Sequence, residues 1–408
     1  MNEASRRAPE EGETGAGHAR GVAEVPAIDG LRGIAALLVL FFHCWVFLDP
    51  PLGGGALRAL VAAGELGVDF FFVISGFVLF LPVVLRDGQF GDVRAYALRR
   101  VARIVPAYYL SLVVQGLAVR WLTGFPIPFA SRGGWLVFGA HLLFLQHELP
   151  ASLARAAGFW GNVVGFGVNG VVWSLSIEAL FYVTLPLVAG RFFRRPVAAL
   201  LLAVATSLAW RAFALSVPGV LTDAPSAAPG PPRLLLQYPS FFAHFAFGMC
   251  GALLYVRAAR SPAPVRRLRW LLAAQPVVLA ALAATMIAHG RNLTGASIDY
   301  GYRLADILPA LAFALLLTLA SIAPRGVLGA LTWPRMRWLG DVSYGVFLWH
   351  LPLVLLVRRH TTLLHEKSDL SFVVLCAIVL PASLLLGWLS RRYVEEPIIG
   401  WARRRTRR

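Results

Sequence analysis

Long apolar runs, separated by short polar connectors, make up most of this chain of 408 residues. Each run is continuously apolar and does not alternate, which favours helices that span a bilayer over the strands of a transmembrane barrel. Eleven runs are candidate spans, at 28–48, 64–85, 105–122, 134–149, 171–190, 197–217, 237–257, 271–289, 303–322, 342–358 and 371–390. The pattern predicts an all-α polytopic membrane protein.

Arginine decides how many of these runs cross the membrane. Arginine-rich connectors lie at 86–103, 191–195, 257–269, 325–337 and 391–408. The positive-inside rule puts them in the cytoplasm, so an even number of crossings separates Arg103 from Arg191. The weakest of the three runs between them is 134–149, which is short and carries polar residues. We expect it to be re-entrant or interfacial, which leaves about ten transmembrane helices with both termini cytoplasmic.

Composition agrees with a membrane protein, since 58% of the residues are apolar and 14% are charged, against about 25% charged residues in soluble domains. The net charge of +17 is assigned to cytoplasmic loops, so no nucleic-acid partner is expected. Heavy use of Arg, Ala, Gly and Pro suggests a bacterial genome rich in G and C. The three cysteines lie within apolar runs without metal-ligand spacing, so no metal is expected.

Three segments follow from these patterns. Residues 1–25 are polar and of mixed charge, which predicts a disordered cytoplasmic tail. Residues 26–400 form one transmembrane domain, and 401–408 form a basic cytoplasmic tail. The first apolar run is long enough to span, so no cleavable signal peptide is expected. The predicted location is the bacterial inner membrane, in contact with the lipid bilayer, and the patterns do not define an oligomeric state.

Two ionisable residues lie within the first apolar run. Arg32 and His43 are eleven residues apart, which in a helix puts both side chains on one face, about 16 Å apart along the axis. Ionisable groups that face lipid are costly, so this face is expected to line a cavity. A cation near the membrane surface and a deeper imidazole suit proton-transfer chemistry on an anionic co-substrate.

A set of motifs resembles the membrane acyltransferase-3 family. They occur in order over about residues 26–400: Ile28-Asp29-Gly30-Leu31-Arg32-Gly33 with His43, Gly67-Val68-Asp69-Phe70-Phe71-Phe72-Val73-Ile74-Ser75-Gly76-Phe77, Arg99-Arg100-Val101-Ala102-Arg103, Trp173-Ser174-Leu175-Ser176-Ile177-Glu178, Ser343-Tyr344-Gly345-Val346-Phe347-Leu348-Trp349-His350, and Glu395-Glu396-Pro397. Each motif is weak alone, and the set is specific.

The resemblance implies transfer of an acyl group from cytoplasmic acyl-CoA, commonly acetyl-CoA, to a hydroxyl acceptor. The acceptor would be a sugar, a cell-surface polysaccharide, a lipid-linked glycan or a secondary metabolite. Matched residue by residue, Arg32 and His43 take essential positions of the first span. Arg100 and Arg103 take the positions of an arginine pair that engages the donor.

The chemistry of these residue types agrees with those roles. Arg100 and Arg103 share a helix face where the third span leaves the cytoplasm, and guanidinium groups suit phosphate oxygens. Ordinary anchoring by cytoplasmic arginines is the alternative. A neutral imidazole at His43 can remove the proton of an acceptor hydroxyl as that hydroxyl attacks the thioester. A buried structural histidine is the alternative there.

Further polar residues of the motifs are candidate supports. Glu178 follows Ser174 by one turn and is expected to pair with His43 or an arginine, either as a catalytic support or as a structural ion pair. Asp29 is placed to pair with Arg32. Asp69 is a candidate either for contact with the acceptor or for a structural role at the start of its helix. Tyr344 and His350 are candidates either for polar groups of the catalytic cavity or for structural residues of the helix core.

Two rival functions use the same residues. A proton-coupled exporter of a glycan or metabolite would use Arg32, His43 and Glu178 as a proton relay. A scaffold that retains the fold without catalysis would tolerate loss of His43. Binding of acetyl-CoA separates the transferase from the exporter.

Overall fold

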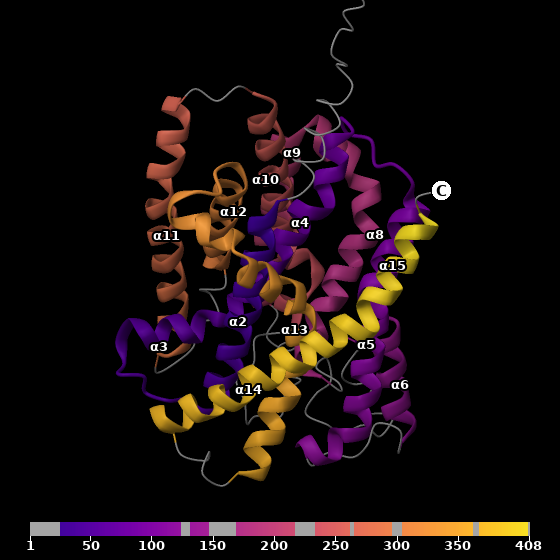
Figure 1. Cartoon of the computed structure of the whole chain (residues 1–408), viewed down its shortest axis with the longest axis vertical. Coiled ribbons are helices and arrows are strands. Elements are labelled where there is room, and N and C mark those ends of the chain that lie inside the picture. The colour runs from indigo at the N-terminus through magenta and orange to yellow at the C-terminus, as the bar shows by residue number, and fades with distance from the viewer. Residues whose placement is uncertain are drawn as a thin grey trace, which may run out of the picture.

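The structure is a computed structural model that describes residues 25–123, 131–146, 169–216, 233–261, 265–295, 304–361 and 367–406. Within these residues every regular element is a helix (Figure 1). The predicted tail over 1–25 lies outside the described residues except for Val25, as do residues 407–408 of the predicted C-terminal tail. Residues 401–405 of that predicted tail belong to a helix over Glu396–Arg405.

Ten helical segments of the described chain are long and apolar enough to cross a membrane, which confirms the predicted all-α polytopic fold. The helices that form them are α2 (Pro26–Leu48), α4 (Gly67–Leu85), α5 (Val93–Thr123), α8 (Trp173–Arg194), α9 (Pro196–Ser216), α10 (Phe242–Arg260), α11 (Val265–Leu293), α12 (Ile307–Ile322), α13 (Pro334–His360) and α14 (Asp369–Ser390). The run at 134–149 yields only the short helix α6 (Arg132–Leu142), beside α5 in Figure 1.

Short elements join or extend these spans. They are α3 (Gly55–Ala62) and the 3₁₀ turn η1 (Ala63–Leu66) before α4, the 3₁₀ turns η3 (Gly170–Val172), η5 (Arg233–Leu236), η6 (Tyr238–Phe241) and η8 (Gly326–Thr332), and the π-helical turn η10 (Arg391–Glu395) before α15 (Glu396–Arg405). The α14–α15 ribbon crosses the front of the bundle obliquely in Figure 1.

One end of the bundle gathers the arginine-rich connectors and both ends of the described chain. Val25 and Arg403 line a common cavity there, and Arg260 at the end of α10 forms an ion pair with Asp87 after α4 (2.9 Å). We call this the basic end. An even number of spans explains why both chain ends lie on it.

Helix α4 lies inside the bundle and positions the site. It packs against α2, α8, α10 and α12, and its contact with α10 depends on two glycines. A Cβ at Gly76 would overlap the Phe245 carbonyl oxygen, and one at Gly248 would overlap the Val73 carbonyl oxygen. Small residues allow this close approach of helix backbones in a membrane, where apolar burial alone does not drive helices together.

Candidate active site

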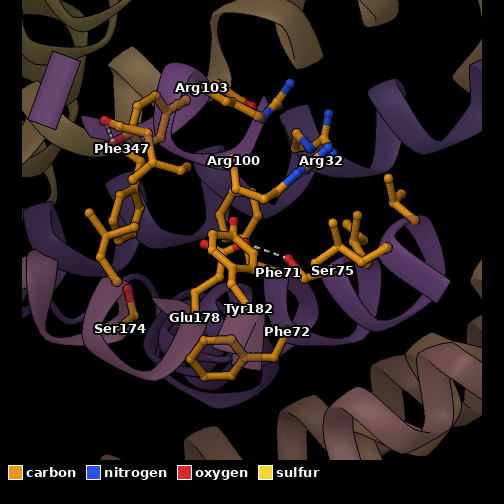
Figure 2. Close-up of a pocket in the computed structure, with 17 residues that line it drawn as sticks. Arg32, Phe71, Phe72, Ser75, Arg100, Arg103, Ser174, Glu178, Tyr182 and Phe347 are labelled. Carbon is orange, nitrogen blue, oxygen red and sulfur yellow. Dashed lines mark hydrogen bonds between the residues drawn. The ribbon is translucent and has the colours of Figure 1, made fainter. Parts of the chain in front are cut away.

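A cavity of about 690 Å³ opens between α2, α4, α5, α8 and α13. We call it the arginine cavity, because Arg32, Arg100 and Arg103 line it. Figure 2 shows their guanidinium groups gathered on one side, with Glu178 and Tyr182 beside them. The other lining residues are Phe71, Phe72, Ile74, Ser75, Val78, Leu79, Ile104, Ser174, Leu175, Ser343, Tyr344 and Phe347.

The three arginines reach this cavity from two helices. Arg32 comes from α2 and lies 3.7 Å from the Asp29 carboxylate one turn earlier. Arg100 and Arg103 come from α5, where a spacing of three residues puts both on one face. Within the described part of the chain neither forms an ion pair with a carboxylate, and the buried Nε of Arg100 has no hydrogen-bond partner. Partly buried guanidinium groups that outnumber the carboxylates around them favour binding of an anion.

Glu178 lies among these arginines and not beside His43. Its carboxylate accepts a hydrogen bond from the Ser75 hydroxyl (2.7 Å), drawn as a dashed line in Figure 2. Ser174 lines the same cavity and donates to the Val171 carbonyl oxygen. The sequence analysis left open whether Glu178 pairs with His43 or with an arginine. The structure places Glu178 in the arginine cavity, bonded to Ser75, and within the described residues it forms no ion pair with either.

Tyr344 connects the cavity wall from α13 to α5. Its hydroxyl donates a hydrogen bond to the Ile104 carbonyl oxygen (2.9 Å), and its ring lines the arginine cavity. This contact fixes α13 against the helix that carries Arg100 and Arg103. His350, two turns further along α13, lies outside the arginine cavity and contacts His43.

His43 lines a different cavity of about 910 Å³, on the other side of the bundle's centre from the basic end. We call it the histidine cavity. It is lined by Val39, Phe42, His43, Glu65, Val68, Asp69, Gly170, Trp173, Arg211, Leu235, Leu236, Phe241 and Asp306. None of these residues also lines the arginine cavity.

The hydrogen bonds of His43 identify its tautomer. Its Nδ1 lies 2.8 Å from the Val39 carbonyl oxygen, which can only accept, so Nδ1 carries the hydrogen. His350 donates from its own Nδ1 to the Val346 carbonyl oxygen (3.1 Å). Its Nε2 then holds a lone pair, 3.2 Å from Nδ1 of His43. In the neutral form the free lone pair of His43 is on Nε2, which has no partner in the described part of the chain.

Asp69, a candidate of the sequence analysis, lies at the histidine cavity with four ionisable residues that the sequence analysis did not assign: Glu65, His244, His289 and Asp306. Asp69 contacts His244 (2.7 Å), and His289 bridges Glu65 and Asp306 with both ring nitrogens (2.7 Å each). Their position inside apolar runs was the signal, because intramembrane ionisable residues are costly unless they face a cavity or a partner. Among the residues that the structure describes, no such group is arranged to hold a metal ion.

Aromatic rings lie between the two cavities. Phe72 of the arginine cavity contacts Trp173 and Phe241 of the histidine cavity, with ring centroids 6.4 and 4.9 Å apart. Phe71 packs against Phe347 (5.9 Å), and Phe347 packs against His350 (6.0 Å). We call Phe71, Phe72, Trp173, Phe241 and Phe347 the aromatic partition.

Comparison with known proteins gives an independent result. Residues 25–392 match the model of a protein family described as an acyltransferase domain. The matched region contains both cavities and all of the predicted site residues.

Curated relatives carry related names. The chain is 26% identical to the putative peptidoglycan O-acetyltransferase YrhL of Bacillus subtilis, and 25% identical to the peptidoglycan O-acetyltransferase OatA of Listeria monocytogenes. Each alignment covers 92% of this chain, which spans about half of either relative (55% and 56%). Acyltransferase MdmB of Streptomyces mycarofaciens is 26% identical, with 92% of both chains covered. No solved structure matches the chain.

Proposed function

Because the chain belongs to the acyltransferase-domain family, we propose that it transfers an acyl group from acyl-CoA to a hydroxyl of an acceptor molecule. It is a multi-pass bacterial membrane enzyme of this family. The assignment of an acyl-CoA donor and a hydroxyl acceptor rests on a pair of cavities. One is lined by arginines and the other by a histidine with a free Nε2.

We assign the arginine cavity to the donor. Coenzyme A carries phosphates at one end and its thioester at the other, joined by the long pantetheine arm. Guanidinium groups of Arg32, Arg100 and Arg103 suit the phosphate oxygens. These arginines lie toward the basic end, which is the cytoplasmic end by the positive-inside rule, and acyl-CoA is a cytoplasmic metabolite. The commonest acyl group is acetyl, as in the names of two of the relatives.

We assign the histidine cavity to the acceptor. Nε2 of His43 accepts the proton of the acceptor hydroxyl while the oxygen attacks the thioester carbonyl carbon. The carbon–sulfur bond then breaks, and the thiolate of coenzyme A takes the proton from His43. The product is an ester on the acceptor plus free coenzyme A. Peptidoglycan and macrolide-type acceptors both fit this chemistry, and the names of the relatives support a glycan.

The thioester and the hydroxyl must meet across the aromatic partition. Phe72 and Phe347 lie on the donor side of it, and His43 lies on the acceptor side. In this proposal, rings of the aromatic partition move aside to let the thioester reach His43. Asp29 and Glu178 support the arginines in this proposal, whereas Asp69 belongs to the acceptor side.

The family supports this transferase over the proton-coupled exporter that the same ionisable residues allowed. Glu178 lies with the arginines, while His43 lies beyond the aromatic partition, so the three residues of the supposed relay do not lie in one cavity. A scaffold without activity would keep the fold but tolerate loss of His43.

Purified protein in nanodiscs tests the proposal. Release of free thiol and transfer of label from radiolabelled acetyl-CoA are followed with a host lysate as the acceptor pool. The variants are His43→Ala and Arg103→Ala, with His360→Ala at the exposed end of α13 as the matched histidine control. We expect acceptor-dependent thiol release in the wild type and the control, and its loss in both site variants.

Two results would overturn the proposal. Unchanged turnover in His43→Ala, in protein whose unfolding temperature is normal, would remove His43 from the chemistry. Absence of acetyl-CoA binding and turnover, in a host that still exports a product, would favour the exporter.

A further inference from the structure

A wider cavity of about 1480 Å³ opens at the basic end, outside the arginine cavity. We call it the vestibule. Arg32, Arg100 and Val78 line both spaces, so the two are continuous. The remaining residues of the vestibule are Val25, Pro26, Ile28, Asp29, Leu81, Pro82, Leu85, Arg86, Arg337 and Arg403.

Three arginines line the vestibule alone, and they come from distant parts of the chain. Arg86 follows α4, Arg337 lies in the first turns of α13, and Arg403 lies on α15. Arg403 is also outside residues 25–392, which match the family model. The C-terminal helix therefore adds a cation to a cavity that the family domain otherwise forms.

The charges of the vestibule are not balanced by its own side chains. Five arginines line it together with one carboxylate, that of Asp29, which pairs with Arg32. Nearby carboxylates of Asp341 and Glu396 pair with Arg391 and Arg392 instead. Within the described part of the chain, Arg337 and Arg403 form no ion pair. Like charges that converge on one cavity repel each other, and a polyanion relieves the repulsion.

The order of the arginines along the two spaces matches the order of groups in coenzyme A. A thioester at the aromatic partition puts the pantetheine arm in the arginine cavity. The 5′-diphosphate then lies near Arg32 and Arg100, which line both spaces. The ribose 3′-phosphate, at the far end of the molecule, lies in the vestibule. Resting on the proposed donor, we propose that Arg337 and Arg403, with Arg86, bind the 3′-phosphate and select coenzyme A over its dephospho form.

The competing explanation for the arginines of the vestibule is that they are ordinary cytoplasmic surface charges, as the positive-inside rule describes. It predicts that all arginines at the basic end act alike on any anion, lipid headgroups included. Helix α15 offers a direct comparison, because Arg403 and Arg404 are adjacent and both exposed, but only Arg403 lines the vestibule. Substitution of either residue removes the same charge from the same helix turn.

Binding of coenzyme A and of dephospho-coenzyme A to purified protein tests the proposal. The protein is held in nanodiscs of neutral phosphatidylcholine, which excludes anionic headgroups, and affinities are measured by calorimetry at fixed ionic strength. Arg337→Gln, Arg403→Gln and the control Arg404→Gln are compared with the wild type. Glutamine keeps much of the side-chain length and removes the charge.

We expect coenzyme A to bind the wild type about tenfold more tightly than dephospho-coenzyme A. Arg337→Gln and Arg403→Gln each reduce or abolish that ratio by weakening coenzyme A alone, whereas Arg404→Gln leaves it unchanged. Arg100→Gln weakens both ligands equally, because it acts at the diphosphate. The preference falls as salt rises, because the vestibule is open to solvent.

Two outcomes overturn the inference while the proposed function stands. One is tight binding of both ligands with equal affinity in the wild type. The other is an equal effect of Arg403→Gln and Arg404→Gln, which would assign Arg403 to general surface charge. Absence of binding of either ligand to the wild type would instead count against the proposed donor itself.

Discussion

Nδ1 of His43 lies 3.2 Å from Nε2 of His350, across 307 residues of sequence. Because both rings also donate from Nδ1 to a carbonyl oxygen one turn earlier, the hydrogen on Nδ1 of His43 is shared between Val39 and His350. His350 thus holds the imidazole in the tautomer that a base at Nε2 requires. It is a positioning residue in the proposed mechanism and does not touch the acceptor.

Replacement of His350 by Ala removes this support. We expect kcat for acyl transfer to fall about 10- to 100-fold, because His43 loses its fixed orientation. The KM for acetyl-CoA stays within twofold, since His350 does not line the arginine cavity. The split between kcat and KM is measured with the acceptor found in lysate. A rise in the donor KM at unchanged kcat would contradict the assignment.

Glu178 is the one carboxylate among the described residues that line the arginine cavity. Glu178→Gln keeps an oxygen that can accept from Ser75 but leaves three guanidinium groups without its charge. We expect a lower unfolding temperature without ligand and a larger increase on addition of coenzyme A, equivalent to about threefold tighter binding.

Thermal unfolding with and without coenzyme A measures both effects. Glu396→Gln is the control, because Glu396 is an exposed carboxylate that pairs with Arg391 and Arg392 outside the cavity. Weaker binding of coenzyme A by Glu178→Gln than by this control would assign Glu178 a direct role toward the ligand.

The contact between α4 and α10 tolerates no side chain at Gly248. Gly248→Ala places a methyl group against the Val73 carbonyl oxygen, so the backbones must separate at a cost of about 1–3 kcal/mol or more. We expect loss of monodisperse protein after detergent extraction. Gly139→Ala on α6, where a Cβ meets nothing within 4 Å, should behave as the wild type. Equal yields of the two variants would be inconsistent with this packing.

His289 joins two carboxylates at the edge of the histidine cavity. His289→Leu removes one partner from each of Glu65 and Asp306 and leaves like charges close together. We expect a loss of about 1–3 kcal/mol in the free energy of unfolding. Addition of Glu65→Gln to His289→Leu should recover part of that loss, because it removes the repulsion. Chemical unfolding of the single and double variants in detergent measures the recovery, and a double variant that is less stable still would disprove it.

The sequence was sufficient for the spans because a bilayer leaves few choices. Backbone groups in lipid must form their own hydrogen bonds, so long apolar runs become helices, and the arginines between them separated α6 from the true spans. The shared face of Arg32 and His43 also followed from helix geometry, but the two residues line separate cavities and not the single cavity that the sequence suggested. All of these features depend on helix geometry and on the local pattern of apolar and charged residues.

Contacts between helices could not be deduced in the same way. The partner of His43 proved to be His350, and Glu178 bonds to Ser75 at 103 residues' separation. Such pairs depend on how α4, α8 and α13 pack, which the glycine contacts of α4 and α10 influence and a single sequence does not reveal. Glu65, His289 and Asp306 had a visible signal as ionisable residues in apolar runs, but nothing local indicated that they meet.

The aromatic partition also bears on the electrical properties of the membrane. Cavities that approach each other from opposite ends of a protein would, if joined by water, form a path for protons and small ions. Rings packed 4.9 to 6.4 Å apart between centroids hold apolar surface at that point, and a narrow apolar constriction resists wetting. The insulation of the bilayer around each copy of this protein therefore depends on a few phenyl and indole side chains.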